Sequence, residues 1–120
     1  MKPVFKNLLV WQKALDFAVK VIKITESLNS SGKHYRLIEQ IEAAAASIPQ
    51  NIAEGKGRYS KKEFIQYLYI SRGSMYETLT LTEIFYRSGW IDEQNYNTIE
   101  SEGIEIINML MGLIESIKTD

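Results

Sequence analysis

Four basic side chains lie within seven residues of one another, at Lys56, Arg58, Lys61 and Lys62. Cationic groups spaced this closely are suited to binding phosphate groups such as those of nucleic acids. Ser60 followed by Glu63 is typical of a helix N-terminus, where phosphates also bind well. Lys61 and Lys62 then lie in the first helical turn, where a cation opposes the helix dipole at a cost of about 0.3–1 kcal/mol. We interpret residues 56–62, the basic turn, as a candidate nucleic-acid-binding site; the alternative is a solvated turn.

Polar residues that interrupt apolar stretches form a second group of interest. Asn51 and Glu54 lie one helical turn apart, and Arg72 and Ser74 interrupt an apolar run further along. A buried charge without a partner costs several kcal/mol. We therefore predict that Glu54 and Arg72 form a mostly buried ion pair. Its expected role is structural, to hold one helix against the next.

Metal-binding patterns are weak in this sequence. His34 is the only histidine, and Ser31 occupies the place of the glutamate that a di-iron Glu-x-x-His motif needs. Two carboxylate pairs have the spacing of one helix face, Glu39 with Glu42 and Glu102 with Glu105. No other potential ligand converges on them in the sequence, so we interpret both pairs as solvated faces. We predict no metal site and no cofactor.

Motifs of catalysis are also missing. The run from Arg72 to Met75 does not have the form of a nucleophile elbow. The run from Gly55 to Arg58 lacks the spacing of a phosphate-binding loop and follows a predicted helix instead of a strand. We therefore predict no catalytic residues and expect that the protein is not an enzyme.

The composition of the 120 residues narrows the class of protein further. Cysteine is absent, which excludes disulfides and fits a reducing cytoplasm. No apolar run reaches the roughly 18–20 residues of a membrane span. Residues 1–36 carry seven Lys/Arg and two Asp/Glu, whereas residues 76–120 carry two and nine. The simplest explanation is a basic helix lying beside an acidic one; the alternative is a basic face.

Apolar residues recur every three or four positions, which predicts helices at about 7–28, 33–54, 60–88 and from 92 onward. Asn7, Ser60 and Asp92 are the expected N-caps, and Gly89 is the expected C-cap. Pro49 predicts a kink near residues 45–49, with a full break as the alternative. Short connections between four helices predict an all-α, up-down-up-down antiparallel four-helix bundle, a single domain over residues 1–120.

The third and fourth predicted helices carry more apolar residues than a small bundle needs. Thirteen of the residues from 64 to 86 are apolar or aromatic, and they point nearly all round the helix. Residues 96–117 carry two apolar stripes. Because excess apolar surface is a liability on a monomer, we predict a homo-oligomer. The alternative is a broader core within one chain.

Several motifs also give the sequence a family resemblance. They are Leu8-x-Val10-Trp11-Gln12-Lys13-Ala14, Gln40, Ala44, Ser47-Ile48-Pro49, Asn51-Ile52-Ala53-Glu54-Gly55, Gly57-Arg58, and Ser71-Arg72-Gly73-Ser74 with Glu77. On these residues the sequence resembles the four-helix-bundle proteins of the 23S ribosomal RNA intervening-sequence family, which are encoded within bacterial large-subunit ribosomal RNA genes. The match covers nearly the whole chain, and the run from Ser47 to Gly55 is its most specific part.

The resemblance implies a bacterial cytoplasmic protein whose bundles assemble into a closed ring of five. A related branch comprises accessory proteins of diversity-generating retroelements, in which a basic surface contacts nucleic acid and the reverse transcriptase. Arg58 and Arg72 are the basic positions that match. Family members often carry two basic residues where this chain has Glu42 and Ala43, a departure that weakens the expectation of nucleic-acid binding.

Two functional hypotheses follow. The first is a non-enzymatic oligomer that binds RNA or a ribonucleoprotein, with the basic turn as its contact. The second is a protein-interaction scaffold or accessory subunit that does not contact nucleic acid. The expected partners are therefore other copies of the chain, with RNA or a reverse transcriptase under the first hypothesis, and no membrane under either.

Overall fold

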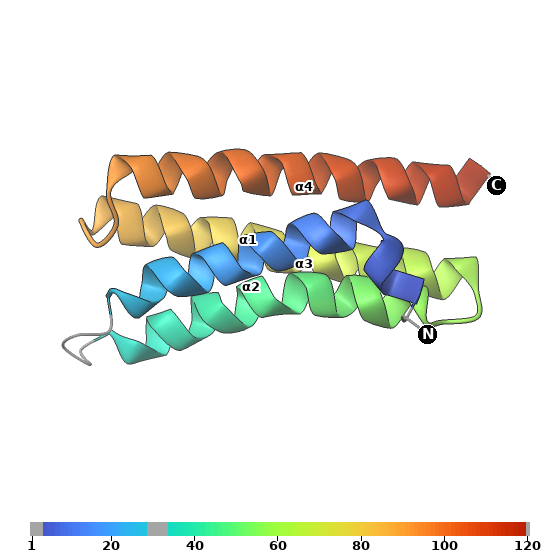
Figure 1. Cartoon of the computed structure of the whole chain (residues 1–120), viewed down its shortest axis with the longest axis horizontal. Coiled ribbons are helices and arrows are strands. Elements are labelled where there is room, and N and C mark those ends of the chain that lie inside the picture. Colours follow the sequence, from blue (N-terminus) through green and yellow to red (C-terminus); the bar gives the residue numbers. More distant parts are fainter. Residues whose placement is uncertain (1–3, 29–33, 120) are drawn as a thin grey trace.

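The computed structural model describes residues 4–28 and 34–119. A short 3-10 turn, η1 (Val4–Asn7), leads into α1 (Leu9–Glu26), which is followed by α2 (Tyr35–Lys56), α3 (Lys61–Arg87) and α4 (Glu93–Thr119). Successive helices run antiparallel (Figure 1). α1 and α3 each contact both α2 and α4 but not each other, so α1 and α3 are diagonally opposed. The predicted all-α, up-down-up-down four-helix bundle is confirmed.

Three of the predicted helix ends are confirmed by their hydrogen bonds. The Ser60 hydroxyl accepts from the backbone N–H of Glu63 at 3.1 Å, and the Asp92 carboxylate accepts from the N–H of Asn95 at 2.7 Å. After α3, Gly89 has a positive φ of 78°. The N–H of Trp90 donates to the carbonyl of Phe85 at 2.8 Å, and that of Gly89 to Tyr86 at 3.0 Å. This pair of bonds is the Schellman motif that glycine favours.

The predicted N-cap at Asn7 is wrong. Asn7 is the last residue of η1, and α1 is preceded by Leu8, which makes no side-chain cap. The side chain of Gln12 instead donates to the carbonyl of Lys6 at 2.7 Å and ties α1 to η1. The 3-10 turn therefore takes the place of a capping side chain. The connection between the first two predicted helices, at residues 29–32, lies outside the described residues.

Pro49 lies inside α2, and the helix continues through it to Lys56. The alternative of a full break at this position is therefore wrong. Pro49 is itself buried, so its ring takes part in the packing of the bundle. The kink predicted near residues 45–49 stays a prediction.

The core is formed by aliphatic and aromatic side chains from all four helices. Its largest fully buried members include Phe17, Ile48, Leu68, Phe85 and Leu110. α3 packs against α2 on one side and α4 on the other, as its apolar composition predicts. On α4, Gly103 lets the side chains of Leu79 and Met75 approach its backbone.

Ion pairs join the basic α1 to the acidic α4. Lys13 lies 2.9 Å from Glu105, and Lys20 lies 2.5 Å from Glu102. The interpretation that a basic and an acidic helix lie side by side is therefore confirmed. Glu102 and Glu105, which the sequence suggested were only solvated, each have a lysine partner on the neighbouring helix. Exposed pairs of this kind contribute little to stability, because water screens the charges.

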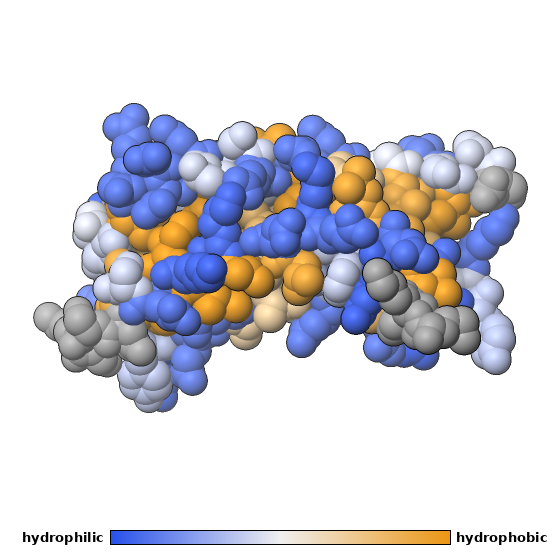
Figure 2. Space-filling model, in the orientation of Figure 1, coloured by the Kyte–Doolittle hydropathy of each residue, from blue (hydrophilic) through white to orange (hydrophobic). Residues whose placement is uncertain are grey.

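Apolar side chains also remain on the surface, on two sides of the bundle. On α3, Ile70, Tyr76 and Ile84 are 51%, 49% and 41% exposed. On the opposite side, a groove of about 360 Å³ runs between α1 and α2, and its lining includes Leu15, Val19 and Pro49. Figure 2 shows apolar surface between the polar side chains on this second side. The predicted surplus of apolar surface on α3 is confirmed, while self-association stays a prediction.

Candidate nucleic-acid interface

The end of α2 packs closely against the start of α3 because Gly55 has no side chain. A Cβ atom on Gly55 would lie 2.7 Å from the Cβ of Tyr67 and 3.2 Å from the backbone oxygen of Phe64. Both of these atoms are fixed to the backbone of α3 and cannot rotate away. Gly55 therefore sets the distance between the two helices where the side chains of the basic turn emerge.

The basic turn is also held in place by its cap. The Ser60 hydroxyl, which accepts from the Glu63 N–H, donates to the Glu63 carboxylate at 3.1 Å. This places the negative charge of Glu63 in the first turn of α3, where the helix dipole favours it. Lys61 and Lys62 lie in the same turn, and both side chains are exposed.

The two other cations of the basic turn contact aromatic rings of α3. The ammonium group of Lys56 lies 5.6 Å from the ring centre of Phe64. The guanidinium of Arg58 lies 4.9 Å from the ring centre of Tyr67 and donates to the Tyr67 hydroxyl at 2.7 Å. Arg58 also donates to Glu54 at 2.6 Å. Tyr67 first, and then Glu54, raise the pKa of Arg58, which keeps its charge fixed.

The structure therefore brings the predicted site residues Lys56, Arg58, Lys61 and Lys62 together around one short connection. This connection lies at the end of the bundle where α1 begins and α4 ends (Figure 1). Glu54 and Glu63 offset part of the charge, but cations outnumber carboxylates in the basic turn and its flanking residues. The cluster presents positive charge at the N-terminus of a long helix, which is a suitable arrangement for phosphate groups.

Tyr59 is a further candidate that the sequence analysis missed. Its side chain is 108% exposed, the largest value among the exposed apolar and aromatic residues of the described chain. It lies in the connection between Arg58 and Ser60 and belongs to neither helix. The sequence did contain a signal for Tyr59. It is an aromatic residue in a basic, glycine-containing turn, and the helical pattern of apolar residues does not assign it to the core.

The predicted ion pair between Glu54 and Arg72 is wrong. The side chain of Glu54 is 56% exposed and binds Arg58, one turn further along the chain. Arg72 lies on another side of α3, with its guanidinium 4.9 Å from the ring of Tyr69 and its Nη1 atom 3.1 Å from the sulfur of Met111 on α4. A helix turns by about 100° per residue, and this rotation directs residue 72 toward α4 and not toward α2.

Hydroxyl groups hold α2 against α3 in place of that ion pair. The buried Ser71 donates to the carbonyl of Ile48 at 2.9 Å, and the hydroxyls of Ser47 and Ser74 bond to each other. Within α2, Asn51 donates to the carbonyl of Ser47 at 2.8 Å. Neutral side chains, and not the predicted charged pair, therefore make the polar contact between the two helices. Neutral hydroxyls avoid the desolvation cost of buried charges.

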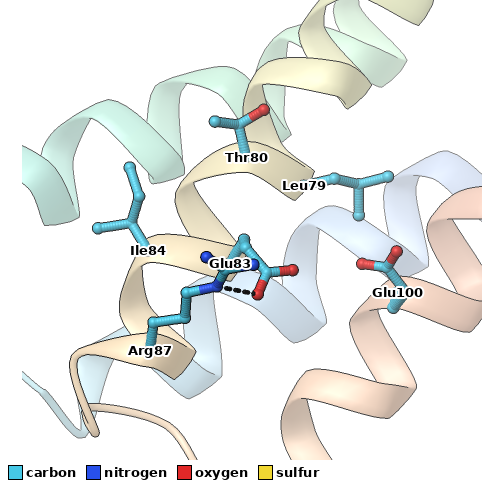
Figure 3. Close-up of a pocket in the computed structure, with 6 residues that line it drawn as sticks. All are labelled: Leu79, Thr80, Glu83, Ile84, Arg87 and Glu100. Atoms are coloured by element: carbon cyan, nitrogen blue, oxygen red, sulfur yellow. Dashed lines mark hydrogen bonds and ion pairs between the residues drawn. The ribbon is translucent and has the colours of Figure 1, made fainter.

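A hollow between α3 and α4 (Figure 3) is distant from the basic turn, near the C-terminal end of α3. Its lining consists of Leu79, Thr80, Glu83, Ile84, Arg87 and Glu100. Glu83 accepts from Tyr96 at 2.6 Å and from Arg87 at 2.9 Å. The bond from Tyr96, and then Arg87, lowers the pKa of Glu83, and the same bond raises the pKa of Tyr96 to about 12. Because Glu83 already has two partners, we interpret this hollow as structural.

Two further properties bear on the kind of site to expect. Within residues 4–28 and 34–119, no three His, Cys, Asp or Glu side chains lie close enough together to hold a metal ion. No helix in the part of the chain that the structure describes is long and apolar enough to cross a membrane.

Comparisons with known proteins agree with the fold and its motifs. The model of the 23S rRNA-intervening sequence protein family matches residues 6–112. A solved structure from Bacteroides thetaiotaomicron, described as a protein with unknown function from the S23 ribosomal protein family, is 29% identical in sequence with a TM-score of 0.84. The similarity covers 88% of this chain and 98% of the other. No curated protein matches the chain.

Proposed function

Because the chain belongs to the 23S rRNA-intervening sequence protein family, we propose that it is a non-enzymatic, oligomeric protein that binds RNA through its basic turn. The observation that carries the proposal is the grouping of Lys56, Arg58, Lys61 and Lys62 at one end of the bundle. RNA carries a phosphate on every nucleotide, and cations gain affinity by releasing its counterions. The absence of cysteine fits the bacterial cytoplasm as the place of action.

The positions of the cations favour a ligand over a purely structural role. Lys61 and Lys62 occupy the first turn of α3, where the helix dipole disfavours positive charge by about 0.3–1 kcal/mol each at an exposed site. An anion bound there would be attracted both by the lysines and by the positive end of the helix dipole. The lysines therefore contribute more to a phosphate complex than to the folded chain alone.

A non-enzymatic role is supported by the chemistry of the buried polar groups. Among the described residues, the buried polar side chains are the hydroxyls of Thr25, Ser71, Thr78 and Thr82. Each of them donates to a backbone carbonyl, so each hydroxyl already has a partner within the bundle. A general acid or base needs a titratable group in a shielded site. Glu83 and Tyr96 have shifted pKa values because they form a hydrogen bond with each other between α3 and α4.

Self-association is supported by the two apolar surfaces. The outward stripe of α3 carries Ile70, Tyr76 and Ile84, and between them Gly73, where an added Cβ would have no atom within 4 Å. Glycine within a helix costs about 0.5–1 kcal/mol relative to alanine, and packing inside this chain gives no reason for it. A helix of a second copy could approach closely at Gly73. The groove between α1 and α2 faces the opposite way, because α1 and α3 are diagonal.

Two different surfaces on separate sides allow head-to-tail contacts, which form a ring where the rotation between neighbouring subunits closes and an open filament where it does not. We take the number five from the family resemblance alone. A ring would repeat the basic turn on every subunit, and repeated weak contacts on one RNA raise the overall affinity. Ile70→Lys should reduce the mass measured by light scattering, whereas Asn97→Lys, at an exposed polar position on α4 away from both apolar surfaces, should not. A monomer mass for the wild type at micromolar concentration would contradict the oligomer.

The RNA proposal is tested with two variants of equal charge. The first changes Lys56, Arg58, Lys61 and Lys62 to Gln, and the second changes Lys6, Lys13, Lys20 and Lys23 to Gln. Each variant lowers the net charge by four, so a difference between them reports position and not total charge. We expect the first variant to bind RNA more weakly at low salt and the second to retain most of its affinity. Equal affinities for the two variants would overturn the basic turn as the contact.

The second candidate function is a scaffold or accessory subunit that binds another protein, such as a reverse transcriptase. The groove between α1 and α2 favours it, because an apolar groove of this kind can accept a partner helix. If the wild type does not bind RNA even at low salt, this second function becomes the leading one. Val19→Lys in the groove would then be the variant expected to lose the protein partner.

A further inference from the structure

Tyr59 has a position that folding does not explain. Its ring is fully exposed, and among the described residues it makes no hydrogen bond or ring contact. Other tyrosines of the chain are used: Tyr67 holds Arg58, Tyr69 lies against Arg72, and Tyr96 donates to Glu83. An exposed aromatic ring leaves a large apolar surface in water. Its presence at the tip of a connection therefore suggests a partner outside the chain.

The surroundings of Tyr59 favour a nucleotide as that partner. Arg58 precedes it, Lys61 and Lys62 follow it, and Lys56 lies at the end of the preceding helix. A flat aromatic face among cations combines the two interactions that bind single-stranded nucleic acid, stacking on bases and attraction to phosphates. In a duplex the base faces are already stacked and cannot be reached from the side. An aromatic face is therefore of use mainly for unpaired nucleotides.

The connection that carries Tyr59 is also firmly mounted. Gly55 packs α2 directly against Tyr67 and Phe64, Ser60 caps α3 at 3.1 Å, and Arg58 is held by Tyr67 at 2.7 Å. Because these contacts hold the backbone of the connection, stacking has to order only the Tyr59 side chain, and this lowers the cost of binding.

From this arrangement we infer that the ligand of the basic turn is single-stranded RNA, and that one unpaired base stacks on Tyr59 while neighbouring phosphates bind the lysines. This inference rests on the proposed function, since it names the kind of RNA that the basic turn binds. It adds a residue, Tyr59, and a discrimination against duplexes that charge alone would not provide.

The test compares Tyr59→Ala and Tyr59→Phe in their binding to an unstructured single strand and to a blunt duplex of the same length. Stacking on one base is worth about 5- to 150-fold in affinity. We expect Tyr59→Ala to weaken single-strand binding by that factor and Tyr59→Phe to restore it, because stacking needs the ring and not the hydroxyl. Neither variant should change the salt slope, because neither removes a charge.

A matched control is Tyr35→Ala, because Tyr35 is 54% exposed and begins α2 at the other end of the bundle. It should bind single strands as the wild type does. If Tyr59→Ala and wild type bind single strands equally, or if duplexes bind as tightly as single strands, the inference is wrong while the proposed function stands. If the wild type binds neither ligand at low salt, the proposed function fails first. A change in oligomer mass for Tyr59→Ala would overturn the inference and assign the ring to a protein contact.

Discussion

The two connections at the ends of α3 join helices of the same bundle but use their side chains differently. In the connection from α3 to α4, Gly89 closes α3 with a Schellman motif and Asp92 caps α4. Trp90, between them, packs 5.0 Å from Phe85 and 3.9 Å from His34, measured between ring centres. Folding accounts for the side chains that define this connection.

In the basic turn, folding explains only some of the side chains. Gly55, Ser60 and the contact between Arg58 and Tyr67 fix its shape. The exposed ring of Tyr59 goes beyond what that shape requires, and the charge of Lys62 opposes the dipole of α3. Two turns of similar length can thus be distinguished by asking which side chains the fold uses. Those that it does not use are the candidates for binding.

The largest expected effect on stability is the difference between removing a buried aromatic ring, Phe85, near one connection and an exposed ring, Tyr59, in the other. Phe85 is 1% exposed, so Phe85→Ala should lower the free energy of unfolding by about 3–5 kcal/mol. Tyr59→Ala should change it by less than about 0.5 kcal/mol, because an exposed side chain makes no packing contact. Urea unfolding followed by circular dichroism measures both values. A decrease of more than about 1 kcal/mol for Tyr59→Ala would show that the ring serves the fold.

A smaller effect is expected at the glycine that supports the basic turn. Gly55→Ala places a methyl group 2.7 Å from the Cβ of Tyr67 and should lower the free energy of unfolding by about 1–3 kcal/mol. Gly57→Ala is the matched control, because its φ of −79° suits any residue and the nearest atom to an added Cβ is 3.6 Å away. Thermal unfolding of the two variants should therefore differ. If both are as stable as the wild type, α2 and α3 are further apart than described.

The variant with Gln in place of Lys56, Arg58, Lys61 and Lys62 should change stability still less. Removing the two lysines from the first turn of α3 is favourable by about 0.3–1 kcal/mol each. The variant also loses the exposed ion pair between Arg58 and Glu54 and the bond from Arg58 to Tyr67, and these losses oppose that gain. The free energy of unfolding at low salt should therefore stay close to the wild-type value. A marked fall would mean that the charges are part of the fold and would remove the contrast between the two connections.

The smallest effect concerns the pH dependence of the hydrogen bond near the end of α3. The pKa of Tyr96 is raised to about 12 because its hydroxyl donates to Glu83. The stability that this bond provides should be complete below pH 10 and lost as the pH rises toward 12. Ultraviolet titration of the tyrosines should show a step near pH 12 that Tyr96→Phe abolishes and Glu83→Gln shifts to lower pH. Persistence of that step in Tyr96→Phe would assign it to another tyrosine.

Features that depend on a few adjacent residues could be predicted from the sequence, whereas features that depend on how the helices are placed against one another could not. The caps at Ser60 and Asp92 and the glycine at residue 89 were predictable, because each depends on a few adjacent residues. The pairing of Glu54 with Arg72 failed because it required the rotation of α3 relative to both of its neighbours. Asn7 failed because a 3-10 turn precedes α1. The position of the basic turn followed from its sequence, but the exposure of Tyr59 did not, since periodicity does not describe connections.

The central claim is that the charges of the basic turn bind RNA, and one salt titration tests it most directly. The logarithm of the RNA affinity is measured against the logarithm of the salt concentration, for the wild type and for the two variants with four Gln substitutions. We predict a flatter line for the basic-turn variant, by about 0.7 for each single-strand phosphate that the protein no longer neutralises. The variant with Gln at Lys6, Lys13, Lys20 and Lys23 should keep the wild-type slope. Equal slopes for all three proteins would contradict the claim.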